Sequence, residues 1–287
     1  MRTYLPVLIS VILSVAVSWV LFKPQTTPIA MTAKSESVYD RVSKSKTLRC
    51  GYINWPPLSQ KDPNTGKMSG MYIDMTEELA RGYGWKVEWA EEISPADMIA
   101  ALNSGRVDMM CAPFAPVPQR TQWAYFSRSH AYGPLKAFVR VDDKRFDNNP
   151  AAINTPEVRI STIEGELTSV LARTGFPKAS VTELSIVQGA TQLFENVATG
   201  KADIVFNDPF TFSAYDANNP GKLRPIVGED IGFFSSSYVI KFGENEFKYV
   251  IDAGLDDLIN RRYIEKLAKD YQILDAGVYL TADDFKK

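Results

Sequence analysis

The chain of 287 residues is poor in the side chains that metal sites and many catalytic sites require. It contains one histidine, His130, and two cysteines, Cys50 and Cys111. A usual zinc site needs three or four such ligands, so we predict no metal and no other cofactor. Neither a glycine-rich dinucleotide motif nor a phosphate-binding loop motif occurs in the sequence. We interpret His130 as a solvated or structural histidine, not as the base of a nucleophilic enzyme.

An excess of charge of either sign is also missing. The chain has 32 basic and 34 acidic residues, which gives a net charge of −2. This balance gives no reason to expect a nucleic acid or an anionic membrane surface as a partner. The 45% of hydrophobic residues and the chain length are sufficient for one large domain or two medium ones.

The N-terminus has one long apolar run. Residues 5–22 carry no charge, Arg2 precedes them and Lys23 follows them. Residues 1–23 are therefore expected to be a signal peptide or an uncleaved membrane anchor, and both alternatives remain open. Residues 24–45 are polar and rich in Pro, Thr and Ser, which indicates a tether. Either way we expect the protein outside the cytoplasmic membrane, anchored or released after cleavage.

Export makes a disulfide between the two cysteines permissible. Both lie in strand-like runs, LRCGYI and VDMMCAP. Residues on neighbouring parallel strands are rarely well placed for such a bond. We therefore favour two buried, unpaired cysteines over a disulfide.

Strand-like and helix-like runs alternate along the chain. The strands TLRCGYI, WKVEWAEE and VDMMCAP are separated by two helical segments. Asp74 is expected to cap the first helix, with Glu77 completing a capping box. This alternation predicts the α/β class, with mainly parallel sheets flanked by helices.

Two segments of the chain resemble each other. In MIAALNSGRVDMMCAP and LFENVATGKADIVFND, an aspartate, Asp108 or Asp203, follows a helix-ending glycine by three residues. The strands then end at equivalent positions, Pro113 and Asp208. This repeat predicts two similar α/β lobes.

The strand-like runs PLKAFVRV and SSSYVIKF flank the second half, and we interpret them as hinge crossings. The last two helical segments are then expected to return to the first lobe. On this interpretation residues 46–138 and 241–287 form lobe 1, and residues 139–240 form lobe 2 with the hinge strands.

The loop at residues 111–127, CAPFAPVPQRTQWAYFS, follows a predicted strand. Pro113, Pro116 and Pro118 stiffen it, and it presents Arg120. A guanidinium is a planar fork that suits a carboxylate. In open parallel sheets, ligands bind beyond the carboxyl ends of the strands, which is where Arg120 would lie. An ordinary surface arginine is the alternative.

Three further features fit the same cleft. The N–H groups that open the helix after Gly165 can hold an anion, and Asp208 can hold an ammonium group. Trp55 precedes two prolines and can stack on a flat or cationic ligand. The alternatives are a plain helix start, a turn aspartate and a core tryptophan. Together these features predict a pocket for a zwitterion, lined by Trp55, Pro95, Pro113, Ala115, Arg120, Glu166, Leu167, Thr168, Asn207 and Asp208.

Between about residues 45 and 275 the chain resembles the type II periplasmic solute-binding proteins, in family 3, which binds polar amino acids. The resemblance rests, in order, on LRCGYINWPPL, NTGKMSGMYIDMTEELARGYGW, AALNSGRVDMM, PQRTQWAYFS, GKADIVFND and YIEKLAKDYQI. It implies a two-lobed fold joined by two hinge strands, which closes over its ligand. It also implies a small, amino acid-like ligand, a permease of an ABC-type importer as partner, and a monomeric protein.

The resemblance assigns the ligand's α-carboxylate to Arg120, its ammonium to Asp208 and its side chain to Trp55. Two departures from the family pattern concern the ligand. Pro113 and Ala115 stand where relatives have hydroxyl side chains. Glu166 follows Gly165 at the helix start, and its charge would repel a carboxylate there. Either Glu166 points away from the ligand, or the ligand presents a cationic group to it.

Two alternative functions follow from the same resemblance. One is a sensory or regulatory binding protein, which would need a separate signalling partner. The other is an enzyme similar to the cyclohexadienyl dehydratases, which carry a catalytic glutamate after the second lobe's helix start. Here Thr168 occupies that place and Glu166 lies two residues earlier. We therefore predict a binding protein, not an enzyme.

Overall fold

The structure is a computed structural model that describes residues 36–274, except residue 57, and residue 280. The predicted signal peptide or anchor lies outside the described residues. Within the described part of the chain, no helix is long and apolar enough to cross a membrane. The last part of the predicted tether differs from expectation, because Val38–Ser45 form helix α2. Its Val42 is fully buried in the core.

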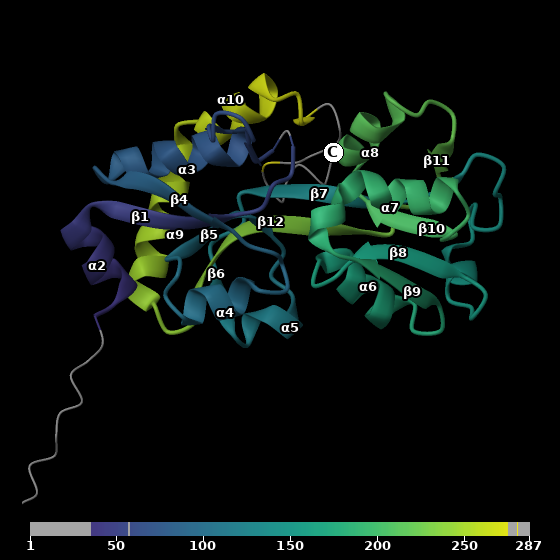
Figure 1. The fold of residues 1–287 in the computed structure, drawn as a ribbon, viewed down its shortest axis with the longest axis horizontal. Coiled ribbons are helices and arrows are strands. Elements are labelled where there is room, and N and C mark those ends of the chain that lie inside the picture. Colours follow the sequence, from purple (N-terminus) through teal and green to yellow (C-terminus); the bar gives the residue numbers. More distant parts are fainter. Residues whose placement is uncertain (1–35, 57, 275–279, 281–287) are drawn as a thin grey trace, which may run out of the picture. The chain divides into compact units, whose positions relative to one another are not determined.

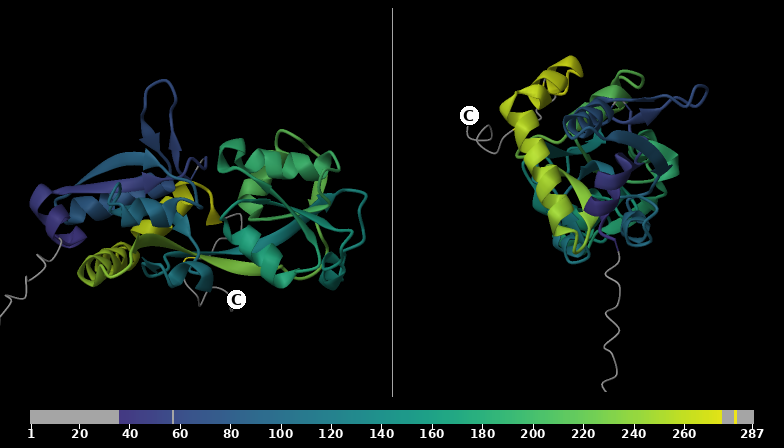
Figure 2. Two further views of the ribbon diagram at one scale, coloured as in Figure 1. Left: turned by 60° about the horizontal axis from the view of Figure 1, so that its bottom comes forward. Right: turned by 90° about the vertical axis from the view of Figure 1, so that its left-hand side faces the viewer.

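Three parallel strands form the first half of the fold (Figure 1). They are β1 (Thr47–Tyr52), β4 (Lys86–Glu92) and β5 (Met109–Phe114), in the order β4-β1-β5. The helices of this half are α3 (Met71–Gly82), α4 (Met98–Asn103), α9 (Asn245–Asn260) and α10 (Tyr263–Asp270). The two C-terminal helices, α9 and α10, pack beside α3 (Figure 2).

The second half repeats this arrangement with the parallel strands β10, β8 and β9. Its elements are β8 (Arg159–Ile163), α6 (Leu167–Gly175), β9 (Ser180–Leu184), α7 (Gly189–Ala198), β10 (Ile204–Asn207) and α8 (Pro209–Asp216). Short elements complete the fold: β2 (Gln60–Lys61), β3 (Met68–Ser69), α5 (Pro118–Thr121), β6 (Ala124–Phe126), η1 (Pro150–Ile153), η2 (Ile186–Gln188) and β11 (Leu223–Pro225).

Two long strands connect the halves. These are β7 (Ala131–Arg140) and β12 (Gly232–Lys241), which pair with each other in antiparallel fashion. Beyond that pairing, β12 joins β5 and β6, whereas β7 joins β10 and β11. They are the two runs that the sequence indicated as hinge crossings, so the two-lobed α/β fold is confirmed.

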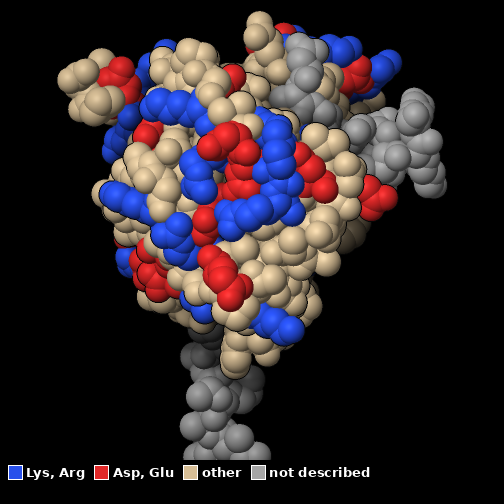
Figure 3. All heavy atoms as spheres, turned by 90° about the vertical axis from the view of Figure 1, so that its right-hand side faces the viewer, with Lys and Arg blue, Asp and Glu red and all other residues tan. Residues whose placement is uncertain are grey.

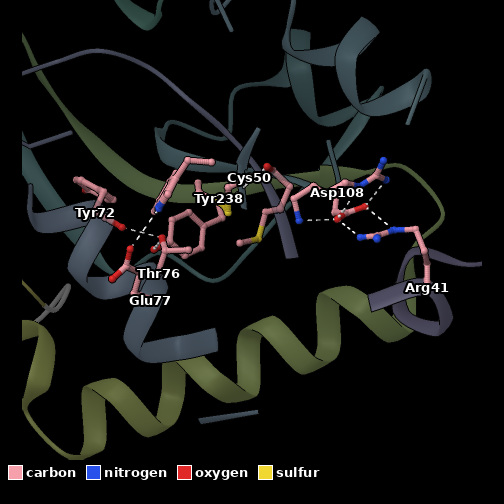
Figure 4. The surroundings of a disulfide bond; sticks show 11 residues. Arg41, Cys50, Tyr72, Thr76, Glu77, Asp108 and Tyr238 are labelled. Carbon is pink, nitrogen blue, oxygen red and sulfur yellow. Dashed lines mark hydrogen bonds and ion pairs between the residues drawn. A yellow bond between two sulfur atoms is a disulfide. The ribbon is translucent and has the colours of Figure 1, made fainter. Parts of the chain in front are cut away.

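The sequence repeat corresponds to a repeated ion-pair arrangement. In the first half, Asp108 donates its N–H to the Arg49 carbonyl (2.8 Å) and accepts from the Arg49 N–H (2.7 Å) and guanidinium (2.8 Å). In the second half, Asp203 makes the same exchange with Arg159. Arg41 also binds Asp108 (Figure 4). Each aspartate therefore fixes the start of one strand against its neighbour.

Two further sequence interpretations are wrong. Helix α3 begins at Met71, so Asp74 lies in its first turn and does not cap it. The preceding residue is Gly70, with φ of 127°, and a Cβ there would lie 2.4 Å from the Leu58 carbonyl oxygen. This close approach sets the helix start. The Asp74 carboxylate does not cap the helix but accepts a hydrogen bond from the Tyr271 hydroxyl (2.8 Å).

The second error concerns the cysteines, because Cys50 and Cys111 form a disulfide (Figure 4). In the parallel register of β1 and β5, Cys50 lies opposite Met109, two residues before Cys111. Side chains two residues apart on a strand face the same way, so both sulfurs meet on one face. The Cα atoms are 5.5 Å apart, within the range that a disulfide needs.

Candidate ligand-binding site

One cavity of about 150 Å³ lies between the strand ends of the two halves. All ten residues that the sequence predicted for the site line this cavity. They come from separate segments of the chain, the first at Trp55 and the last at Asp208. Their role in binding stays a prediction.

Arg120 lies in α5, directly after the proline-rich loop, with Pro118 at the first helical position. Its side chain is almost completely buried and donates to the carbonyl oxygens of Ala115 (3.4 Å) and Gly165. The guanidinium also lies over the Phe114 ring, 5.6 Å from its centroid. Burial lowers the pKa of Arg120. These contacts fix the orientation of the Arg120 side chain. A guanidinium has further N–H groups beyond the two used here, and these can donate to a ligand.

Asp208 directly follows β10 and caps helix α8. Its two carboxylate oxygens accept from the N–H and the hydroxyl of Thr211, each at 2.7 Å. Burial raises the pKa of Asp208, although these hydrogen bonds oppose the shift. The Trp55 indole donates to the same Thr211 hydroxyl at 3.4 Å, so the predicted aromatic and acidic residues share one wall.

Glu166 is half-buried at the N-cap of α6, but its side chain does not cap the helix. It is one of the residues that line the cavity. That the ligand presents a cationic group to Glu166 stays a prediction. Burial of the carboxyl raises the pKa of Glu166 to about 7, while Arg120 lowers it and Asp208 raises it. With this pKa, the carboxyl is about half protonated at pH 7.

Gly165 allows α6 to approach the first half. Its φ is +75°, and a Cβ at this position would lie 2.8 Å from the backbone nitrogen of Ala96. Pro95, the neighbour of Ala96, lines the cavity together with Leu167 and Thr168. The Thr168 hydroxyl is buried without a hydrogen-bond partner among the described residues.

A sequence profile of the bacterial extracellular solute-binding proteins, family 3, matches residues 48–273. The chain belongs to this family. Among curated proteins, this family 3 member is 25% identical over 224 residues to a probable amino-acid ABC transporter-binding protein of Haemophilus influenzae, covering 75% of this chain and 82% of the relative. It is 23% identical over 240 residues to the L-cystine-binding protein TcyA of Bacillus subtilis, covering 83% and 86%.

Solved structures share the fold of this family 3 protein. One is an ancestral amino acid-binding protein, AncCDT-1, described as a precursor of cyclohexadienyl dehydratase. It superposes with a TM-score of 0.70 and 23% identity, covering 82% of this chain and 99% of that one. Another is a solute receptor for L-cysteine of Neisseria gonorrhoeae, with a TM-score of 0.69, 16% identity, and coverage of 82% and 93%.

Sequence reasoning missed several lining residues of this solute-binding protein. Tyr72 comes from α3, Phe210 from α8, and Phe234 and Ser236 from β12. A hinge strand must pass the cavity between the lobes, so alternation along SSSYVIKF and the residues before it could have indicated Phe234 and Ser236. Tyr72 carried no such signal. Across residues 36–274, apart from residue 57, no group of three acidic, histidine or cysteine side chains could hold a metal ion.

Proposed function

We propose that the protein captures an amino acid, or a related amine or carboxylate, and delivers it to an ABC-type importer. The observation that carries this proposal is the pair of opposite charges, Arg120 from the first half and Asp208 from the second, on the walls of one cavity. An α-amino acid carries the complementary pair of charges on one carbon. The names of the Haemophilus and Bacillus relatives support the same class of solute and the same kind of importer.

In this proposal the ligand's carboxylate binds Arg120, and its ammonium binds Asp208. Trp55 and the apolar lining residues then cover its side chain. Binding favours the closed arrangement because only that arrangement brings both charged walls onto one ligand. The protein acts as a monomer outside the cytoplasmic membrane, held by residues 5–22 or released after their removal, and its closed form is what the permease recognises.

The test is a thermal-shift screen of the protein against the amino acids, polyamines and small carboxylates. A ligand raises the unfolding temperature of the wild-type protein by mass action. Arg120→Ala should abolish the shift caused by a carboxylate ligand. Arg106→Ala is the matched control, because Arg106 is an exposed arginine of the same half that pairs with Glu91 outside the cavity. An unchanged shift in the Arg120 variant contradicts the assignment.

The raised pKa of Glu166 favours a second candidate, an enzyme that uses this carboxyl as a general acid. We propose binding without turnover, because Thr168 occupies the position of the dehydratase glutamate. An assay of prephenate consumption decides between the two. Measurable turnover that Glu166→Gln removes would establish the enzyme.

A further inference from the structure

The charges that line the cavity do not balance for a zwitterion. Among the described lining residues, three carry formal charges: Arg120, Glu166 and Asp208. The fully ionised cavity therefore has a net charge of −1, whereas an amino acid with an uncharged side chain brings no net charge. A carboxylate that is shielded from water without a positive partner is costly, so a bound neutral ligand would leave one acidic group uncompensated.

Glu166 is the acidic lining residue whose side chain has no hydrogen bond or ion pair to another described residue, and Arg120 acts on it only through its charge. The carboxylate of Asp208 already accepts two hydrogen bonds from Thr211. The hydrogen bonds of Arg120 go to the carbonyl oxygens of Ala115 and Gly165, and none goes to Glu166. Glu166 also makes no side-chain cap to α6, although it occupies the capping position. Its carboxyl is thus available to the contents of the cavity.

The remaining lining suits a cation on a carbon stem. Aromatic rings attract organic cations through their faces, and apolar walls hold an aliphatic chain. The aromatic lining residues are Trp55, Tyr72, Phe114, Phe210 and Phe234.

We propose that Glu166 binds a second positive group of the ligand, so that the preferred solute is an amino acid of net charge +1. This inference rests on the proposed function and names the class of side chain within it. Glu166 is then the residue that determines specificity, while Arg120 and Asp208 hold the ligand's common carboxylate and ammonium groups.

Binding of a cationic ligand next to Glu166 should release protons. The groups that act on the pKa of Glu166 are Arg120, from α5, and Asp208, at the start of α8. With a pKa of about 7 the empty site is half protonated at pH 7, and a bound cation stabilises the carboxylate. Binding at pH 7 should therefore release about half a proton, and affinity should rise about tenfold from pH 6 to pH 8.

The experiment is titration calorimetry on the full-length protein with L-arginine and L-citrulline, which have similar size but differ in side-chain charge. At pH 8 the wild type should bind arginine about 10 to 100 times more tightly than citrulline. Glu166→Gln should reduce this preference to less than about threefold and flatten the pH dependence. Titrations in buffers of different ionisation enthalpy should show proton release by the wild type and none by this variant.

Glu164→Gln is the control, because Glu164 is exposed, lies two residues away and does not line the cavity. It should keep the preference and the proton release. Equal affinity of the wild type for both ligands, or a preference that survives in Glu166→Gln, would overturn the inference while leaving the amino-acid receptor intact. Failure of the wild type to bind any amino acid would overturn the proposed function itself.

Discussion

The disulfide between Cys50 and Cys111 should make a large contribution to stability, because it closes a long loop. The two residues are 61 apart in sequence. In the chain-entropy treatment, a cross-link over a loop of this length disfavours the unfolded state by about 4 kcal/mol at 25 °C. Both cysteines are fully buried in the sheet of the first half. The bond joins β1 and β5. Trp55, which follows β1, and Pro113, near the end of β5, both line the cavity.

Urea unfolding of the oxidised and reduced wild-type protein measures this contribution. The oxidised form should have a free energy of unfolding about 2 to 4 kcal/mol higher, with the upper value if the entropic estimate applies in full. The double variant Cys50→Ala/Cys111→Ala provides the comparison, because it should resemble the reduced protein apart from a smaller loss of packing. A difference below about 1 kcal/mol between the oxidised and reduced forms would refute the loop-closure reasoning.

Further predictions concern buried polar groups. Asp108→Asn should lower the free energy of unfolding by about 2 to 4 kcal/mol in urea, because two arginines lose a buried carboxylate partner. The control Asp142→Asn, at an exposed position, should change the free energy of unfolding little. Equal losses in the two variants would contradict a stabilising role of the Asp108 ion pairs. His130 is fully buried, and burial lowers its pKa to about 3 from 6.5. Because its folded pKa is lowered, stability should fall as pH drops below 6.5, by about 2 to 3 kcal/mol between pH 7 and pH 4.5. Urea unfolding of His130→Phe should lack this contribution, and an identical pH dependence would show that His130 is not responsible.

Periodicity and the internal repeat were sufficient to predict the two-lobed arrangement. Alternating strands and helices specify parallel βαβ units, and the repeat around Asp108 and Asp203 specifies two of them. The start of α3 was not predictable in this way. It depends on the approach of Gly70 to the Leu58 backbone, a contact between segments that local capping patterns do not encode.

The disulfide was missed for a related reason. General experience with parallel strands argued against it, but the outcome depends on register. Cys50 lies opposite Met109, and this places Cys111 on the same face at a bonding distance. A shift of one residue would have turned one sulfur to the other face. Register between strands separated by a helix follows from tertiary packing, which the sequence pattern alone does not reveal.

The repeated unit also explains why the two walls of the cavity differ in charge. At the start of β5 and of the β10 segment, Asp108 and Asp203 make the same exchange with an arginine on the neighbouring strand. Five residues later the two copies differ, since Pro113 is uncharged and Asp208 is acidic. The shared end stabilises each sheet, and the divergent ends, Pro113 and Asp208, both line the cavity. A symmetric pair of walls would bind a ligand equally in two directions. In the proposed function, the acidic wall on one side and the Arg120 loop on the other would allow only one direction for an amino acid's ammonium and carboxylate.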